Sequence, residues 1–171
     1  VSMEQLKIEL ASLFGKTINN MIKAPQIKSD IVLYPNDSLL KKSVFWKFSR
    51  DSDQDLIEII SKMHKTMISL SGVGISAPQI GINKNIIVFY NACMVNPIIY
   101  HKTDSTDIQS EGCLSLPGRF YDVKRSKGIR VEWVDPFTRE LMQQHFSGFT
   151  ARIIQHEIDH IYGKLINEIH E

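Results

Sequence analysis

The segment QHEIDH, residues 155–160, has the residue types and the spacing of half a metal site. If this segment is helical, His156 and His160 are four residues apart, so both imidazoles project from one face and can bind one ion. Glu157 lies three residues before His160, close to that face but rotated away from the line between the histidines. Its carboxylate can therefore act as a general base on a water without binding the metal. The pattern favours a hydrolytic metal centre over the alternative, a structural helix with two incidental histidines.

A catalytic site for a zinc-like ion needs three protein ligands and one open position, so a third ligand must lie outside this segment. The metzincin continuation H-E-x-x-H-x-x-G-x-x-H matches at Gly163 but has Ile166 where the third histidine should stand. Glu168 and Glu171 come close to the last residue of the sequence and are poor candidates. We therefore expect the third ligand upstream of the histidines.

Several upstream side chains could complete the site: Cys113, Cys93, His64, His101, His145 and Glu111. Cys113 lies in EGCLSLPG, which we expect to be a tight, non-helical segment, and a thiolate is a strong ligand for a divalent metal. Cys93 lies among apolar residues, where a small buried hydrophobic side chain is the usual role. Cys113 could instead be a nucleophile with a histidine as its base. We favour the ligand role, because a nucleophile would leave the histidine pair incomplete.

A glycine-rich segment, GVGISAPQIG at residues 72–81, is the third candidate. Its first six residues match the G-x-G-x-x-A form of a dinucleotide fingerprint, but that motif must follow a strand and open a helix. Here it follows a predicted helix, so the dinucleotide hypothesis is rejected. The side-chain amide of Gln79 could donate a hydrogen bond to a developing oxyanion. A plain turn remains the alternative for this segment.

Hydrophobic spacing predicts the elements that must position these residues. The predicted helices span residues 4–22, 53–70 and 149–162, and the predicted strands span 85–90, 94–100, 128–134 and 140–147. The last two strands read as a hairpin, and Gly163 is a natural helix end. The order indicates an α+β fold, with mixed or antiparallel sheets packed around a central metal-binding helix and an extra N-terminal helix. We expect residues 1–30 to be a helical extension and 31–171 the main domain.

Composition restricts the function classes. The chain has 171 residues, of which 43% are hydrophobic and 23% charged, and its formal net charge of +1 gives no electrostatic footprint for nucleic acid or an anionic membrane. The short basic runs at residues 41–42 and 124–125 are interpreted as solvated surface. Two cysteines fit a reduced compartment better than a disulfide scaffold. No apolar run reaches transmembrane length, and the first residues lack the order of a signal peptide. We therefore expect a soluble, cytoplasmic protein.

Taken together, the three segments resemble the peptide deformylase family. The motifs of that family are GxGxAAPQxG, EGCLS and QHExDH, and this chain has GVGISAPQIG, EGCLS at residues 111–115 and QHEIDH in the same order. The match continues through YPND at 34–37, NP at 96–97 and SGFTAR at 147–152, so it covers roughly residues 31–167. Ser76 departs from the pattern, because the family usually has alanine there.

The resemblance implies a role for each matching position. Cys113, His156 and His160 would hold one divalent ion, with Fe²⁺ the usual physiological metal and Zn²⁺ or Ni²⁺ able to replace it. Glu157 would be the acid/base. The family removes the N-formyl group from new polypeptides that begin with formyl-methionine and releases formate, so nascent chains at the ribosome are the expected partners and no nucleic-acid or membrane partner is expected.

The resemblance also implies substrate contacts. The side-chain amide of Gln79 and the backbone N–H of Leu114 would stabilise the oxyanion, and Gly74 would help bind the substrate backbone. Phe149 and Ile153 precede His156 on roughly the same helix face, and we predict that they line an apolar pocket for the methionine side chain. The alternatives are a zinc peptidase of the H-E-x-x-H type, which would cut internal amide bonds, and a non-catalytic domain.

Overall fold

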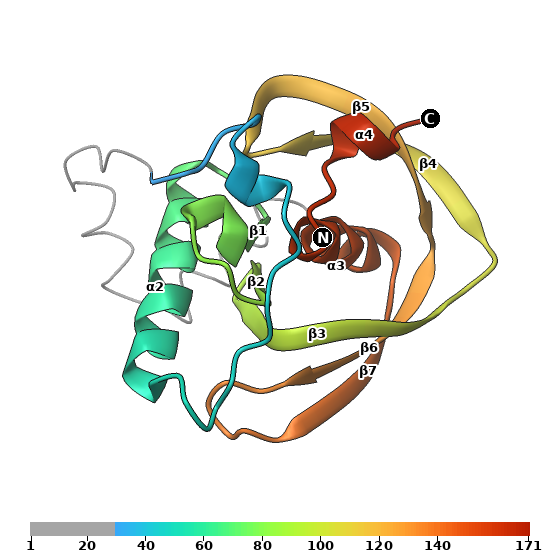
Figure 1. The fold of residues 1–171 in the computed structure, drawn as a ribbon. Coiled ribbons are helices and arrows are strands. Elements are labelled where there is room, and N and C mark those ends of the chain that lie inside the picture. The colour runs from blue at the N-terminus through green and yellow to red at the C-terminus, as the bar shows by residue number, and fades with distance from the viewer. Residues whose placement is uncertain (1–29) are drawn as a thin grey trace, which may run out of the picture.

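The computed structural model of the chain describes residues 30–171 (Figure 1). Its helices are η1 (Asp37–Leu39), α2 (Asp53–Ser69), η2 (Ala77–Ile80), α3 (Gly148–Ile161) and α4 (Ile166–Ile169), where η denotes a 3₁₀ helix. Its strands are β1 (Gly74–Ser76), β2 (Ile86–Phe89), β3 (Ala92–Lys102), β4 (Thr106–Cys113), β5 (Leu116–Ser126), β6 (Gly128–Val134) and β7 (Leu141–Ser147). The predicted helix at 4–22 lies outside the described residues, so the division of the chain at residue 30 stays a prediction.

The strands form two antiparallel sheets. One has five strands in the order β1-β2-β3-β6-β7, and the other is the two-stranded β4-β5 hairpin. In Figure 1, α3 is seen nearly end-on in the middle of the molecule, with β1 and β2 on one side and the β4-β5 hairpin on the other. The α+β class, the antiparallel sheets and the central position of the metal-binding helix are therefore confirmed.

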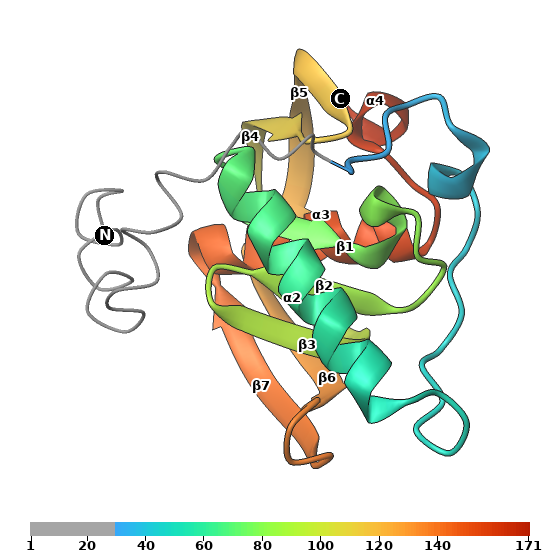
Figure 2. The same ribbon diagram turned by 90° about the vertical axis from the view of Figure 1, so that its left-hand side faces the viewer.

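The edge of the five-stranded sheet that carries β1 and β2 is buried on both faces. Alternate residues of β2 point to opposite sides, and both sides are apolar. Ile87 and Phe89 pack with α3, whereas Ile86 and Val88 pack with α2. Figure 2 shows α2 lying across the front of β1, β2 and β3, with α3 behind them. The strand is thus held between two helices.

Local sequence explains where the helices begin and end. The Ser52 side chain accepts a hydrogen bond from the Asp55 backbone N–H and caps α2 in an S-x-x-D pattern. Leu56, Met63 and Met67 are buried apolar residues at helical spacing, so they form the core-facing side of α2. α3 ends at Ile161 and is followed by Gly163, whose φ of +72° is a left-handed conformation that glycine adopts without a steric penalty.

Strand β3 is irregular around Pro97. The pairing between β3 and β6 shifts register between Val95 and Ile98, and Pro97 lies in that interval. Because β3 is a central strand, a proline there needs a bulge, since it cannot donate to the sheet ladder. Among the helices of residues 30–171, none is both long and apolar enough to cross a membrane.

Candidate metal centre

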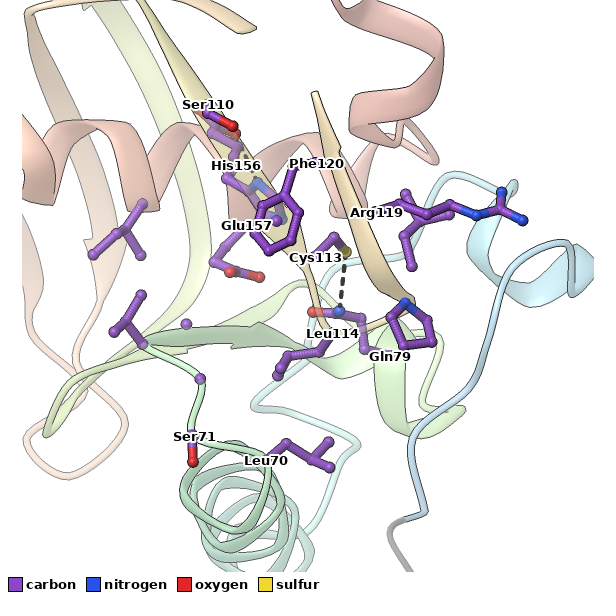
Figure 3. A pocket seen from close by; sticks show the side chains of 18 of the residues that line it. Leu70, Ser71, Gln79, Ser110, Cys113, Leu114, Arg119, Phe120, His156 and Glu157 are labelled. Atoms are coloured by element: carbon purple, nitrogen blue, oxygen red, sulfur yellow. Dashed lines mark hydrogen bonds and ion pairs between the residues drawn. The ribbon is translucent and has the colours of Figure 1, made fainter. Parts of the chain in front are cut away.

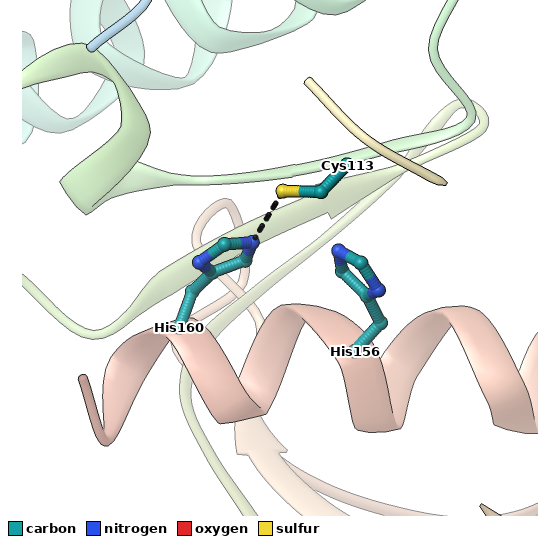
Figure 4. Close-up of side chains that lie close together, drawn as sticks. All are labelled: Cys113, His156 and His160. Carbon is teal, nitrogen blue, oxygen red and sulfur yellow. Dashed lines mark hydrogen bonds between the residues drawn. The ribbon is translucent and has the colours of Figure 1, made fainter. Parts of the chain in front are cut away.

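Three side chains from two elements converge on one point. Cys113 at the end of β4 faces His156 and His160 on α3, and the ligand atoms of the three residues all lie within 4.8 Å of one another. The Cys113 Sγ atom is 3.3 Å from Nε2 of His160 (Figure 4). One thiolate and two imidazoles are donors that divalent transition metals accept, and three protein ligands leave one position open. The residues therefore fit a divalent ion, and they form a metal site.

The β4-β5 turn places the thiol. The ladder between β4 and β5 shifts register between Gly112 and Cys113, and Cys113 then pairs with Leu116 across a turn of only Leu114 and Ser115. This confirms the prediction of a tight, non-helical segment. The two strands that flank the turn, β4 and β5, were not predicted from the sequence.

Glu111 fixes the orientation of one metal ligand. Its Oε2 atom lies 2.9 Å from Nδ1 of His156. When Nδ1–H donates to this carboxylate, Nε2 is left as the free lone pair for a metal. Burial alone would raise the pKa of Glu111, but the hydrogen bonds from His156 and Arg125 lower it to about 2. The carboxylate is therefore ionised at neutral pH and can accept the imidazole proton.

Two buried arginines hold Glu111 in turn. Arg125 donates from Nε to Oε1 at 2.6 Å and from a terminal nitrogen to Oε2 at 2.9 Å, which is the bidentate geometry. Arg152 donates to Oε1 at 2.6 Å. The same two arginines reach Asp159 and Asp107, each at 2.6–2.7 Å. β4, β5 and α3 are therefore connected by one charged network behind His156.

Sequence reasoning missed this network. The basic pair at residues 124–125 was interpreted as solvated surface, and for Arg125 this was wrong, because the residue is only 6% exposed. Its charge is compensated by Glu111 and Asp159, which lie 14 and 34 residues away in sequence. Arg152 belongs to the SGFTAR segment that matches the family, and this match was the sequence feature that could have indicated a role for Arg152. Nothing in the local sequence around Arg125 indicated burial.

His160 is a buried, neutral ligand. Burial lowers its pKa well below the ordinary value for histidine, so the imidazole is neutral and one ring nitrogen has a free lone pair for a metal. Its Nδ1 atom has no hydrogen-bond partner among the described residues. The two histidines are therefore supported unequally, since His156 is held by Glu111 and His160 by packing.

Glu157 lies beside the metal ligands with one oxygen unpaired. The residue is 4% exposed, and its Oε2 atom has no hydrogen-bond partner in the described part of the chain. Burial raises the pKa of Glu157 to about 7. A Cβ atom added at Gly74 would lie 2.5 Å from Oε1 of Glu157, so only glycine permits β1 to approach this closely.

The Gln79 side chain lies beside the Cys113 thiol and is held by hydrogen bonds to Ser76 and Ser115. Its Oε1 atom accepts hydrogen bonds from the Ser76 backbone N–H at 3.0 Å and from the Ser76 hydroxyl at 3.3 Å. Its Nε2 atom donates to the Ser115 hydroxyl at 3.1 Å. The same nitrogen lies 3.7 Å from Cys113 Sγ, the contact drawn as a dashed line in Figure 3. The amide N–H groups thus face the metal site. The buried hydroxyl of Ser76, unusual for the resembled family, finds its partner here.

These groups surround a cavity of about 530 Å³. Its lining includes Gly74, Gln79, Leu114, Ile153, Phe149 and Glu157 together with two of the metal ligands, Cys113 and His156. Ile153 is buried in its wall at 5% exposure, whereas Phe149 is 57% exposed and lies at its rim. Figure 3 shows Cys113, Glu157 and Gln79 around the same space. All the substrate-contact candidates therefore border one cavity.

The remaining ligand candidates lie elsewhere. Cys93 is half-buried on β3, and burial raises its thiol pKa to about 11. His64 is on α2, and His101 and His145 are exposed on β3 and β7. None of these side chains joins the group of three in residues 30–171. The preference for Cys113 as third ligand agrees with the structure.

An H-E-x-x-H helix, a cysteine from a neighbouring hairpin and a cavity open to the metal site define a metal-dependent hydrolase. Residues 28–170 match the family model for polypeptide deformylase. The chain belongs to the polypeptide deformylase family, and its activity is the removal of the formyl group from N-terminal formylmethionine. The predicted family and function are confirmed.

Individual relatives support this assignment. A peptide deformylase of Karelsulcia muelleri is 38% identical over 144 residues, which cover 79% of this chain and 74% of the relative. One of Pseudothermotoga lettingae is 36% identical over 120 residues, covering 68% and 70%.

Solved structures agree with the sequence relatives. The actinonin-bound class I type b peptide deformylase of Acinetobacter baumannii superimposes with a TM-score of 0.79 at 32% identity, covering 83% of this chain and 97% of that one. The peptide deformylase of Thermotoga maritima gives 0.77 at 32% identity, covering 82% and 96%.

Proposed function

We propose that Glu157 moves the proton in deformylation, because its buried, unpaired carboxylate lies beside the metal ligands. This placement is the observation that carries the proposal. With a pKa of about 7, the group can accept and return a proton near neutral pH. It accepts a proton from the attacking water and delivers it to the amine nitrogen as the C–N bond breaks. Formate and a free N-terminal amine are the products.

The metal we propose for the cell is Fe²⁺, with Zn²⁺ or Ni²⁺ able to occupy the same ligands. Imidazole and thiolate donors bind all three ions, so this preference rests on the resemblance to the family. A divalent ion at this site supplies Lewis acidity, lowering the pKa of a water molecule from about 15.7 towards about 7. Cys113, His156 and His160 hold it, and Glu111 keeps His156 in the tautomer that can bind.

Gln79 and Leu114 would stabilise the negative charge that develops on the formyl oxygen. The Gln79 amide is fixed with its N–H groups towards the thiol, since Ser76 occupies its oxygen. Leu114 lies directly after Cys113, so its backbone N–H leaves the same turn. Each donor of this kind is commonly worth about 3 kcal/mol in the transition state.

The substrate would enter along β1. This strand is at the edge of the five-stranded sheet, so its backbone polar groups are paired with β2 on one side only. An extended peptide could hydrogen-bond to Gly74 along the other side. Ile153 and Phe149 would then contact the methionine side chain, Ile153 from the wall of the cavity and Phe149 from its rim.

We place this activity on nascent chains in the cytoplasm, with the ribosome as the site of encounter. Support comes from the substrate itself, because an N-formyl group marks the start of a new chain. Both cysteines are free thiols in the structure, which fits a reducing compartment.

The test is formate release from formyl-Met-Ala-Ser. It is compared with removal of the acetyl group from acetyl-Met-Ala-Ser and with cleavage of internal amide bonds in a blocked peptide that has no formyl group. We expect formate from the first substrate only. Glu157→Gln should lower kcat by at least about a hundredfold, since it removes the proton carrier but keeps the shape. Glu168→Gln on α4, which changes an exposed glutamate, is the matched control. Cleavage of the blocked peptide would instead favour a peptidase, and full activity of Glu157→Gln would remove that residue from the reaction.

A further inference from the structure

The two proposed oxyanion donors belong to different sheets. Gln79 is on η2, which directly follows β1 of the five-stranded sheet, whereas Leu114 is in the turn of the β4-β5 hairpin. Neither sheet ladder therefore fixes the distance between them. The distance between Gln79 and Leu114 therefore depends on the contacts that join η2 to the β4-β5 turn.

An extended segment at the start of the described chain makes such a connection. The backbone N–H of Val32 donates to the carbonyl oxygen of Gln79 at 2.7 Å. Two residues later, the backbone N–H of Tyr34 donates to the carbonyl oxygen of Ser115 at 3.0 Å. We name residues 32–34 the strap. Its first residue is hydrogen-bonded to Gln79, and its last residue is hydrogen-bonded to the turn that contains Leu114.

Packing holds the strap in place. The side chains of Val32 and Tyr34 are half-buried against the cluster around Leu39, Leu116 and Leu165. The carbonyl of Leu33 accepts a hydrogen bond from the Asn36 backbone N–H at 3.1 Å, which closes a turn immediately after the strap. The strap is therefore a fixed part of the described fold.

The elements that the strap joins are short and have few backbone hydrogen bonds of their own. η2 is a single 3₁₀ turn of four residues, and the β4-β5 turn follows a register shift. A side-chain bond from Gln79 to Ser115 at 3.1 Å also joins them, but it uses the Gln79 amide group that is proposed to donate to the oxyanion. The two hydrogen bonds of the strap use backbone carbonyls, so they leave the Gln79 side-chain amide available.

We infer that Val32 and Tyr34 are positioning residues for deformylation, which hold Gln79 and Leu114 at the separation that fits the oxyanion. The inference rests on the proposed oxyanion roles of Gln79 and Leu114. Donors of this kind act only within about 2.7–3.1 Å of the developing charge. The strap therefore acts on the transition state through backbone hydrogen bonds to Gln79 itself and to Ser115, the residue after Leu114.

Amide-to-ester substitution in the full chain tests this directly. Replacing the residue at 32 or 34 by its α-hydroxy analogue removes the N–H donor and keeps the side chain. The matched control is the same change at Leu33, whose N–H donates to no backbone carbonyl in the described residues. Each protein is loaded with Fe²⁺ under anaerobic conditions. The readouts are kcat and KM for formyl-Met-Ala-Ser, metal content and thermal unfolding.

We expect the esters at 32 and 34 to lower kcat by about tenfold, a part of the ~10²–10³ that loss of a whole donor costs. KM should stay within about twofold, because ground-state binding is not changed. Metal content should equal that of the Leu33 ester. Unchanged kcat in both esters would overturn the inference, as would a loss that only tracks metal content or unfolding temperature.

A second comparison separates the strap from the proposed function. In a Gln79→Ala background the ester at 32 should have no further effect on kcat, because the donor it positions is gone. A further tenfold loss in that background would contradict action through Gln79. If Gln79→Ala itself keeps full kcat, the oxyanion role of Gln79 fails, whereas an inactive Gln79→Ala with normal esters refutes only the strap.

Discussion

At the scale of single residues, one metal ligand is oriented by a chain of hydrogen bonds that runs from His156 to Glu111 and on to two arginines. His156 can bind a metal because Glu111 accepts its Nδ1 proton, and Glu111 stays ionised because Arg125 and Arg152 surround it. Each buried charge has a partner of opposite sign, which is the condition under which buried charges persist. The buried Glu157 differs from them, since its Oε2 atom has no hydrogen-bond partner in residues 30–171.

Arg125→Lys should weaken metal binding while the chain still folds. Lysine keeps the charge but cannot make the bidentate contact with Glu111, so His156 loses its fixed orientation. We expect Zn²⁺ affinity to fall about 10- to 100-fold in a chelator competition. Arg130→Lys, at an exposed position on β6, is the control. Equal affinities in the two variants would show that the network behind His156 does not tune the site.

Cys93 should react slowly with alkylating agents at neutral pH. Burial raises its pKa to about 11, so the thiolate fraction at pH 8 is about one in a thousand. In the Cys113→Ala chain, which retains only this cysteine, the alkylation rate should rise about tenfold per pH unit up to about pH 11. Rapid alkylation at pH 7 would mean that the thiol is not buried as described.

At the scale of elements, sequence patterns predicted those parts whose burial follows a simple period. α2, β2, β3, the β6-β7 hairpin and α3 all have apolar residues at regular spacing or a strong turn sequence between them. β1, β4 and β5 were not predicted. β1 has only three residues, and the one fully buried side chain of β4 is Glu111. A strand that buries a charge for the site has no hydrophobic alternation to detect.

The same division applies to the candidate site. The metal ligands and the candidates that line the cavity beside them were identified, because metal ligands and glycine-rich turns have characteristic types and spacing. The supporting arginines were not, since their partners are tens of residues away in sequence. The predicted N-terminal helix stays a prediction.

The end of the metal helix should depend on Gly163. A Cβ atom there would lie 2.7 Å from the Leu40 backbone oxygen and would also face a φ of +72°. Gly163→Ala should therefore destabilise the chain by at least about 2 kcal/mol in urea unfolding. Gly148→Ala, at a φ of +61° with no atom within 4 Å, isolates the backbone strain and should cost about 1 kcal/mol. Equal costs would show that the contact with Leu40 relaxes.

At the scale of the whole molecule, the chain before α2 connects the layers. Besides the two bonds of the strap, Ser43 donates to the carbonyl at the end of α3 at 2.8 Å, and the carbonyl of Val44 accepts from Asn85 at 2.8 Å. The backbone N–H of Trp46 donates to the Asn96 side chain at 2.7 Å. The early chain thus joins α3, both sheets and the bulge of β3.

The metal should add to this cohesion, because its ligands come from the β4-β5 hairpin and from α3. An ion that binds only the folded chain stabilises it by about 2.7 kcal/mol at a hundred times its Kd. Removing the metal with a chelator should therefore lower Tm by roughly 5–10 °C, and restoring Zn²⁺ should reverse the change. A Tm that does not respond to metal would argue against a site shared by the two elements.

The most direct test of the central claim is metal-dependent formate release by Cys113→Ala beside Cys93→Ala, with metal content measured anaerobically in the same samples. We expect one bound divalent ion and full release of formate from formyl-Met-Ala-Ser for Cys93→Ala, because the Cys93 thiol is outside the site. For Cys113→Ala we expect loss of both. Full metal occupancy and undiminished formate release in Cys113→Ala would contradict a centre formed by Cys113, His156 and His160.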